Sequence, residues 1–274
     1  MNYRHAFHAG NFADVHKHIG LLALLEHLHK KPAPFFVLDT HAGRGQYDLH
    51  SVEARRGGEW QNGIGRLRAL TTASPLIERY RTLIDSTATF YPGSPLIAAS
   101  MLRDKDRAVF VEKQPEEVAA LRHALGRRKN VSILEADGYV ALKAHLPPKE
   151  NRGLVLIDPP YESDTEFVDV TQALKNALAR WPNGIYCVWY PIKPGAAERR
   201  MYRSLVDAGV KKLLIATLNI RPSDSPLGLN GSGLLIANPP WQFDVQMREV
   251  LSKLYRALAP EGLGGTQVEW LAGE

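Results

Sequence analysis

The chain has 274 residues, of which 45% are hydrophobic and 23% charged, the composition of an ordinary globular protein. One cysteine, Cys187, excludes a disulfide framework, and no cysteine and histidine spacing typical of a zinc site is present. No apolar run of about 18 residues predicts a membrane span, and the N-terminus lacks the apolar core of a signal peptide. We expect a soluble, cytoplasmic protein whose net charge of +5 mildly favours a polyanionic partner.

The first predicted element is a helix over residues 14–29, whose apolar residues recur at helical spacing and for which Asp14 is a candidate cap. Short apolar runs then predict strands, because continuous apolar runs suit strands that are covered on both faces. These runs span residues 35–38, 108–111, 131–134, 153–157, 185–189, 213–216 and 233–237, and a final run at 266–271 could close the sheet edge.

Helix-like segments separate most of these strands, over residues 115–125, 139–146, 167–181 and 196–208. This alternation predicts an α/β fold with a mostly parallel sheet and helices on both faces. We expect a single domain over residues 1–274. Residues 46–92 interrupt the alternation, are richer in Arg, Gly and Thr, and hold predicted helices at 61–70 and 75–87. They indicate a small helical insert.

Three polar motifs follow the first three strands of the predicted sheet. Asp39 begins a turn that contains Gly43 and Gly45, and such a turn lets the backbone approach a ligand, although a tight strand-to-helix turn looks the same. Glu112 ends the second strand, where an acidic residue typically binds ribose hydroxyls, and the insert explains its distance from the glycines. Asp137 follows the third strand and could accept from an adenine amine or cap the next helix.

The most specific motif is Asp158-Pro159-Pro160-Tyr161, directly after the fourth strand. The two prolines remove two backbone donors and stiffen the chain, which leaves carbonyls and the Asp158 carboxylate as acceptors. An exocyclic amine on a planar base could donate to Asp158 and to the Pro159 carbonyl while Tyr161 stacks on the ring. The motif therefore favours chemistry on the amine of a nucleobase.

The order of these motifs is the one used by class I methyltransferases that bind S-adenosylmethionine. The glycine turn, Glu112, Asp137 and Asp158 follow strands one to four in turn. A similar run, Asn238-Pro239-Pro240-Trp241, follows a later strand, out of reach of such a cofactor's methyl group. We interpret that second run as structural.

The chain resembles the RlmJ family in motifs that span its whole length in order. They are Tyr3 to Asn11, Ala13 to Val15 with Lys17 and His18, Leu38 to Gly43, Tyr91 to Pro95, Asp158 to Tyr161, and Trp189 to Pro191. Phe12 and His16 depart from the family pattern. The resemblance implies a Rossmann-like methyltransferase that methylates the exocyclic amine (N6) of one adenine in bacterial 23S ribosomal RNA, with S-adenosylhomocysteine as product.

The resemblance also implies roles for individual residues. Asp158 would be the catalytic carboxylate, within a catalytic motif completed by Pro159, Pro160 and Tyr161. The cofactor would be surrounded by Lys17, His18, Asp39, His41, Gly43, Ser94, Glu112, Asp137 and Gly138. Tyr3 would meet the RNA, and we assign Arg4 and Asn11 of the same stretch and the basic pair Arg55 and Arg56 of the insert to the RNA as well. A helical insert is a feature of the family.

Alternatives remain open at this stage. A DNA adenine methyltransferase would use the same Asp-Pro-Pro-Tyr chemistry, although a dedicated target-recognition domain is missing. A protein glutamine methyltransferase usually has Asn in place of Asp158. A nucleic-acid-binding module on a decayed methyltransferase fold would lack activity, against which the intact Asp158 and Glu112 argue. We expect no metal, since the ten histidines show no ligand pattern, and a monomer.

Overall fold

The computed structural model describes residues 4–71, 74–86 and 90–273. An eight-stranded sheet has the order β10-β8-β9-β7-β6-β1-β4-β5, and a separate ribbon pairs β2 with β3. The strands are β1 (Phe36–Asp39), β2 (Gln46–Asp48), β3 (Phe90–Pro92), β4 (Arg107–Glu112), β5 (Val131–Glu135), β6 (Gly153–Ile157), β7 (Ile185–Ile192), β8 (Leu213–Asn219), β9 (Gly231–Ala237) and β10 (Gly265–Ala272).

Ten α-helices and two short helical turns connect the described strands. They are η1 (His5–Phe7), α1 (Phe12–His29), α2 (Val52–Gly57), the π-helical turn η2 (Gln61–Gly65), α3 (Arg66–Ala69), α4 (Pro75–Asp85), α5 (Ser94–Ser100), α6 (Pro115–Leu125), α7 (Gly138–His145), α8 (Glu166–Arg180), α9 (Glu198–Asp207) and α10 (Phe243–Leu258).

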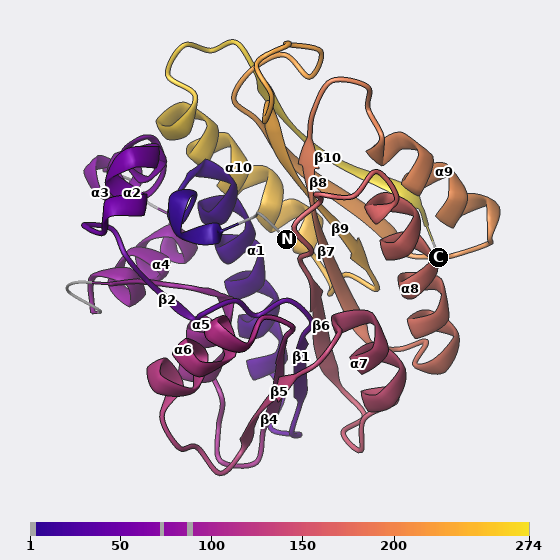
Figure 1. Cartoon of the computed structure of the whole chain (residues 1–274). Helices are drawn as coiled ribbons and strands as arrows, with labels where there is room; N and C mark the ends of the chain where they lie inside the picture. Colours follow the sequence, from indigo (N-terminus) through magenta and orange to yellow (C-terminus); the bar gives the residue numbers. More distant parts are fainter. Residues whose placement is uncertain (1–3, 72–73, 87–89, 274) are drawn as a thin grey trace.

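The sheet separates two layers of helices, as Figure 1 shows. Alternate residues of each strand point to opposite faces. Val37 and Leu154 therefore join the core formed with α1, α4, α5 and α10. Their neighbours Leu38 and Val155 join a second core formed with α7, α8 and α9. Strands β5, β4, β1, β6 and β7 are parallel, whereas β9 and β10 run antiparallel to their neighbours. The predicted α/β fold with a mostly parallel sheet is confirmed.

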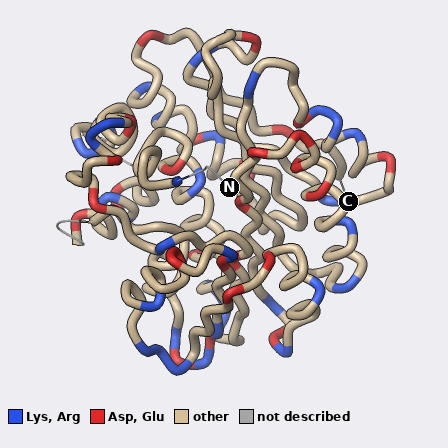
Figure 2. The backbone as a smooth tube through the Cα atoms, in the orientation of Figure 1, with Lys and Arg blue, Asp and Glu red and all other residues tan. Residues whose placement is uncertain are grey.

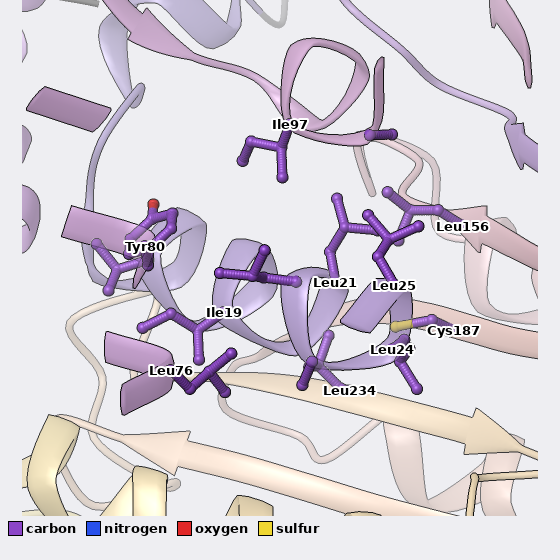
Figure 3. Close-up of a cluster of buried hydrophobic side chains, with 14 of the residues drawn as sticks. Ile19, Leu21, Leu24, Leu25, Leu76, Tyr80, Ile97, Leu156, Cys187 and Leu234 are labelled. Carbon is purple, nitrogen blue, oxygen red and sulfur yellow. The ribbon is translucent and has the colours of Figure 1, made fainter. Parts of the chain in front are cut away.

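The N-terminal helix α1 is enclosed by protein over most of its length. Figure 3 shows Ile19, Leu21, Leu24 and Leu25 of α1 among side chains of α4, α5 and three strands. Gly20 lets α1 approach the sheet, because a Cβ there would lie 2.4 Å from a methyl carbon of Leu234. Such a helix has little amphipathic pattern, since nearly all of its faces are buried. This burial fixes the polar residues of α1 relative to the sheet.

The segment 46–92 lies between β1 and α5 and contains β2, α2, η2, α3, α4 and β3. The predicted helix over 61–70 is a π-helical turn followed by the short α3, and the predicted helix over 75–87 ends at Asp85. Ile64, Leu67 and Tyr80 of this segment are buried in the same core as α1. The insert therefore packs against α1 and α10, within the core on that side of the sheet.

Three further α-helices, namely α2 of the insert, α5 and α10, were not predicted from the sequence. Helix α5 begins with Ser94 and Pro95, and α10 follows the Asn238-Pro-Pro-Trp run. The cap of α1 also differs from the prediction: Asn11 accepts from the Asp14 backbone N–H at 2.9 Å, so Asn11 is the N-cap. Asp14 lies one turn further on, which frees its carboxylate for other partners.

Parallel strands bring their carboxyl ends to one edge of the sheet. β1 pairs with β4 on one side and with β6 on the other, so the chain crosses in opposite directions from β1. Ligands of open α/β sheets bind in the crevice at such a switch point. The residues after β1, β4, β5 and β6 therefore meet where a ligand site is expected.

Candidate active site

A cavity of about 1090 Å³ lies at this edge of the sheet. It is lined by residues from η1, α1, α7 and α8 and from the turns that follow β1, β4, β5, β6 and β7. Most of the predicted site residues line it: Arg4, Asn11, Lys17, His18, His41, Gly43, Ser94, Glu112, Asp137, Gly138, Asp158, Pro159, Pro160 and Tyr161. Residues that are distant in the sequence are thus brought together around one space.

Asp158 is at one end of an ion-pair chain that the sequence did not indicate. The Lys17 ammonium donates to Asp158 Oδ2 at 2.6 Å and lies 3.0 Å from Asp14 Oδ1. Asp14 Oδ2 accepts from the Gly10 backbone N–H and lies 2.9 Å from His5 Nε2. The Lys17 and Asp14 side chains are 6% and 3% exposed, so water screens their charges weakly.

The buried charges keep one another ionised. Burial by itself would lower the pKa of Lys17, but the carboxylates of Asp14 and Asp158 raise that pKa well above its usual value. Burial would likewise raise the pKa of Asp14, but His5 and Lys17 hold it well below the usual range. One ammonium therefore faces two carboxylates, and Asp158 Oδ1 makes no hydrogen bond to the described residues.

Tyr161 closes the wall of the cavity beside Asp158. It has φ 50°, a left-handed conformation that turns the chain sharply after the two prolines. Its hydroxyl donates to the Trp189 carbonyl at 2.8 Å, and its ring contacts the rings of Trp189 and Phe167. The ring is thus held in place by β7 and α8.

At the other end of the cavity, Glu112 and Asp137 organise two turns. Glu112 Oε2 accepts from the Gly43 N–H at 2.9 Å, and its Oε1 accepts from the two backbone N–H groups that follow it. Asp137 caps α7 through Oδ1, while Oδ2 lies 3.2 Å from Lys113 Nζ. A Cβ on Gly138 would lie 2.3 Å from the Thr40 carbonyl, so α7 begins directly against the β1 turn.

Asp39 is behind this wall and does not line the cavity. It accepts from Ser94 Oγ at 2.7 Å through Oδ2 and from the His41 N–H through Oδ1. Burial raises the pKa of Asp39 to about 7, although both hydrogen bonds oppose the rise. Asp39 thereby orients two residues that do reach the cavity.

The two predicted histidines of the site, His18 buried and His41 half-buried, are uncharged at neutral pH. Burial lowers the pKa of His18 to about 3 and that of His41 to about 4. His18 Nδ1 lies 2.9 Å from the Tyr91 hydroxyl, and His41 Nδ1 lies 2.8 Å from Thr40 Oγ1. Both rings therefore present neutral surfaces to the cavity.

The predicted RNA residues are divided. Arg4 and Asn11 line the cavity, but both polar groups of the Asn11 side chain are used, one by the cap of α1 and one by Glu59. Arg55 and Arg56 are exposed on α2, outside the lining but next to η1. Tyr3 lies outside the described residues.

Several lining residues were missed by sequence reasoning. Asp14, His5 and Trp189 belong to stretches that carried the family resemblance, but Asp14 was predicted only as a helix cap and the other two were given no role. Tyr139, which donates to Glu166 at 2.5 Å, and Lys193 carried no motif. The second run resembling Asp-Pro-Pro-Tyr lies elsewhere, and the Asn238 amide donates to the Pro182 and Gly184 carbonyls.

Comparison with known proteins adds to this geometry. The family described as "Ribosomal RNA large subunit methyltransferase D, RlmJ" matches residues 32–272. The chain belongs to this family. Relatives called "Ribosomal RNA large subunit methyltransferase J" from Haemophilus influenzae and Escherichia coli are 42% and 38% identical, and in both comparisons 100% of each chain is covered.

A solved structure has the same fold over nearly the whole chain. A protein from Legionella pneumophila is 36% identical, with a TM-score of 0.87 over 96% of this chain and 98% of that one. Membership confirms the predicted class of enzyme, a methyltransferase of large-subunit ribosomal RNA. Among the described residues, no helix is long and apolar enough to cross a membrane, and no group of three or more metal-ligating side chains is found.

Proposed function

We propose that this protein transfers the methyl group of S-adenosylmethionine to the exocyclic amine (N6) of an adenine in 23S ribosomal RNA. The observation that carries the proposal is the position of Asp158-Pro159-Pro160-Tyr161, directly after β6 and facing the cavity at the switch point of the sheet. Family membership supports ribosomal RNA as the substrate. The acceptor-rich motif supports the exocyclic amine as the group that is methylated.

The cavity residues fit S-adenosylmethionine. A volume of about 1090 Å³ is large enough for a nucleoside cofactor and a base together. Glu112 stands where ribose hydroxyls are expected, and its Oε2, with one protein donor, keeps a further acceptor site. Backbone at Gly43 and Gly138 forms a close-packed cradle. When bound, the cofactor supplies an electrophilic methyl group on a cationic sulfur, which suits this acidic end of the cavity.

Asp158 and Pro159 would act on the adenine amine. Its lone pair is delocalised into the ring, and hydrogen bonds from its two hydrogens to Asp158 Oδ1 and the Pro159 carbonyl would favour a tetrahedral nitrogen. Lys17 holds Oδ2 and so fixes the carboxylate before the base arrives. Positioning of this kind supplies several kcal/mol of barrier reduction.

The buried charges suit a nitrogen that becomes positive. Asp14, Lys17 and Asp158 together carry a net charge of −1, held in place by short contacts. Asp158 would also take the proton that the amine loses, directly or through water. The base must leave its stack to reach Asp158, and the ring of Tyr161 would hold it there.

The substitution Asp158→Asn tests the proposal. It keeps the size of the side chain but removes the charge that would stabilise the amine, so we expect methylation of unmodified 23S RNA to fall at least a hundredfold. Cofactor affinity, measured by calorimetry, should change less than about threefold because Asp158 is proposed to contact the target adenine and not the cofactor. Turnover near the wild-type rate in this variant would reject the assignment of Asp158.

A further inference from the structure

We propose that the groove between α8 and α9 is a second RNA-binding surface, which takes phosphates of the strand that flanks the target nucleotide. This inference rests on the proposed function, because it extends the path of the RNA beyond the cavity. The open groove has a volume of about 570 Å³ and is lined by Lys175 of α8 and by Arg200, Arg203, Ser204, Asp207 and Ala208. Three cations against one carboxylate give this lining a net charge of +2.

The sequence of α9 builds the groove. Met201 and Leu205 are buried against the sheet, which turns the opposite side of the helix outward. Arg200, Arg203 and Asp207 recur at spacings of three and four residues, so they share one face. Across the groove, Lys175 Nζ donates to Ser204 Oγ at 2.9 Å, which holds this cation next to the arginines.

Arg200 and Arg203 of α9 differ from several other arginines of the fold in their charge partners. Arg44, Arg103 and Arg107 form ion pairs of 2.5 to 2.9 Å with acidic side chains. Within the described part of the chain, neither Arg200 nor Arg203 forms an ion pair, and both are exposed. Exposed guanidinium groups without a carboxylate partner are well suited to phosphate oxygens.

The groove is within reach of the cavity. Asp169 lines the cavity and Lys175 lines the groove, and six residues of α8 separate them, which is about 9 Å along a helix. That length corresponds to about three stacked nucleotides of one strand at roughly 3.4 Å each. On the other wall, Lys193 lines the cavity and lies just before α9. An RNA strand can therefore continue from the cavity into the groove.

Charge selects the side on which the strand passes. The α8 side of the cavity rim carries Glu162 and Asp169, which repel phosphates, whereas Lys193 lines the cavity on the side that leads to α9. Figure 2 shows Lys and Arg along α9 on the right of the molecule. In Figure 1, α2 with its own basic pair lies at the left, with β6 and β7 between α2 and α9. The RNA strand continues in both directions from a flipped nucleotide. The basic surfaces of α2 and α9 would each bind one of these two flanking segments.

The test is the affinity of the full-length protein for naked 23S RNA transcribed in vitro, measured by filter binding at several salt concentrations. We expect the double variant R200E/R203E to raise the Kd about tenfold. We also expect the negative slope of the logarithm of the association constant against the logarithm of the salt concentration to become less steep by about 2. The milder pair R200Q/R203Q, which keeps long polar side chains, should weaken binding in the same direction. Unchanged cofactor affinity and melting temperature would show that the fold is intact.

The matched control is K30E/K31E. These two cations are exposed after α1, before the amino end of β1 and away from the cavity, and their reversal changes the net charge by the same amount. We expect the control to alter the Kd less than twofold. An unchanged Kd in R200E/R203E, or equal weakening in the control, would overturn the inference. Because RNA binding is measured without methyl transfer, failure of the proposed function would appear separately, as RNA binding without methylation.

Discussion

At the scale of residues, the decisive feature is the contact between Lys17 and Asp158. The two residues are 141 positions apart, and the Lys17 ammonium lies 2.6 Å from the Asp158 carboxylate in the wall of the cavity. Asp14 joins them from within α1. Removing one partner of a buried ion pair leaves an uncompensated charge and costs about 3–5 kcal/mol. This chain of charges therefore links the stability of the site with its chemistry.

Asp14→Asn tests that link. We expect a loss of about 3 kcal/mol in unfolding free energy, because Lys17 loses one of its two carboxylates. We also expect kcat to fall at least tenfold with little change in the KM for the cofactor, since Lys17 would no longer hold Asp158 in one position. Glu249→Gln is the control, because its exposed pair with Lys253 contributes less than about 1 kcal/mol. An unaltered kcat would show that Asp14 has no positioning role.

The two aromatic residues of the similar motifs give a matched comparison. Tyr161 faces the cavity, whereas Trp241 is 82% exposed after β9. If Tyr161 holds the flipped base, Tyr161→Ala should lower kcat/KM for RNA by about tenfold or more, and Tyr161→Phe, which keeps the ring, much less. Trp241→Ala should leave RNA methylation unchanged. Equal effects of the two alanine substitutions would contradict the role of Tyr161.

At the scale of elements, α1 is both a core helix and a wall of the site. Its burial forces polar side chains into the protein, and His16 is an example. His16 Nδ1 lies 2.9 Å from Ser232 Oγ, while its Nε2 has no hydrogen-bond partner among the described residues. Burial lowers the pKa of His16 to about 3, against the opposing effect of the Ser232 bond. We therefore expect α1 to be sensitive to acid.

His16→Leu should reduce that sensitivity. The pKa of His16 is lower in the folded chain, so the unfolded chain binds the proton first as the pH falls below about 6.5, and stability is lost toward acid. Between pH 7.5 and pH 5 this residue accounts for a loss of about 2 kcal/mol. Urea unfolding at both values should show that much less loss in the variant. His123→Leu, at an exposed position on α6, should leave the difference between the two pH values unchanged, and a wild-type difference in His16→Leu would refute the account.

The elements differ in how far the sequence predicted them. The parallel strands were found because each is a continuous apolar run, and the final run does form the edge strand β10 against β8. Helix α10 was missed although Phe243, Met247, Val250 and Leu254 have helical spacing. The strands of the insert were harder to predict from the sequence. β2 and β3 have only three residues each, and they pair with each other although almost the whole segment lies between them.

At the scale of the whole molecule, topology explains why the site could be predicted at all. Residues at the ends of parallel strands meet at one edge, so Glu112, Asp137 and Asp158 could be grouped without a structure. No comparable rule predicts the contacts that α1 makes. Whether Lys17 reaches a cofactor or a carboxylate depends on how α1 lies on the sheet, and packing decides that.

For the molecule as a whole, we propose adenine N6 methylation of RNA as the reaction. The most direct measurement incubates the purified protein with tritiated S-adenosylmethionine and 23S RNA from a strain that lacks the enzyme, with duplex DNA in parallel, and identifies the labelled nucleoside after nuclease digestion. We predict N6-methyladenosine in the RNA and no label in the DNA. Label in the DNA, label in another nucleoside, or no label in either polymer would contradict this account.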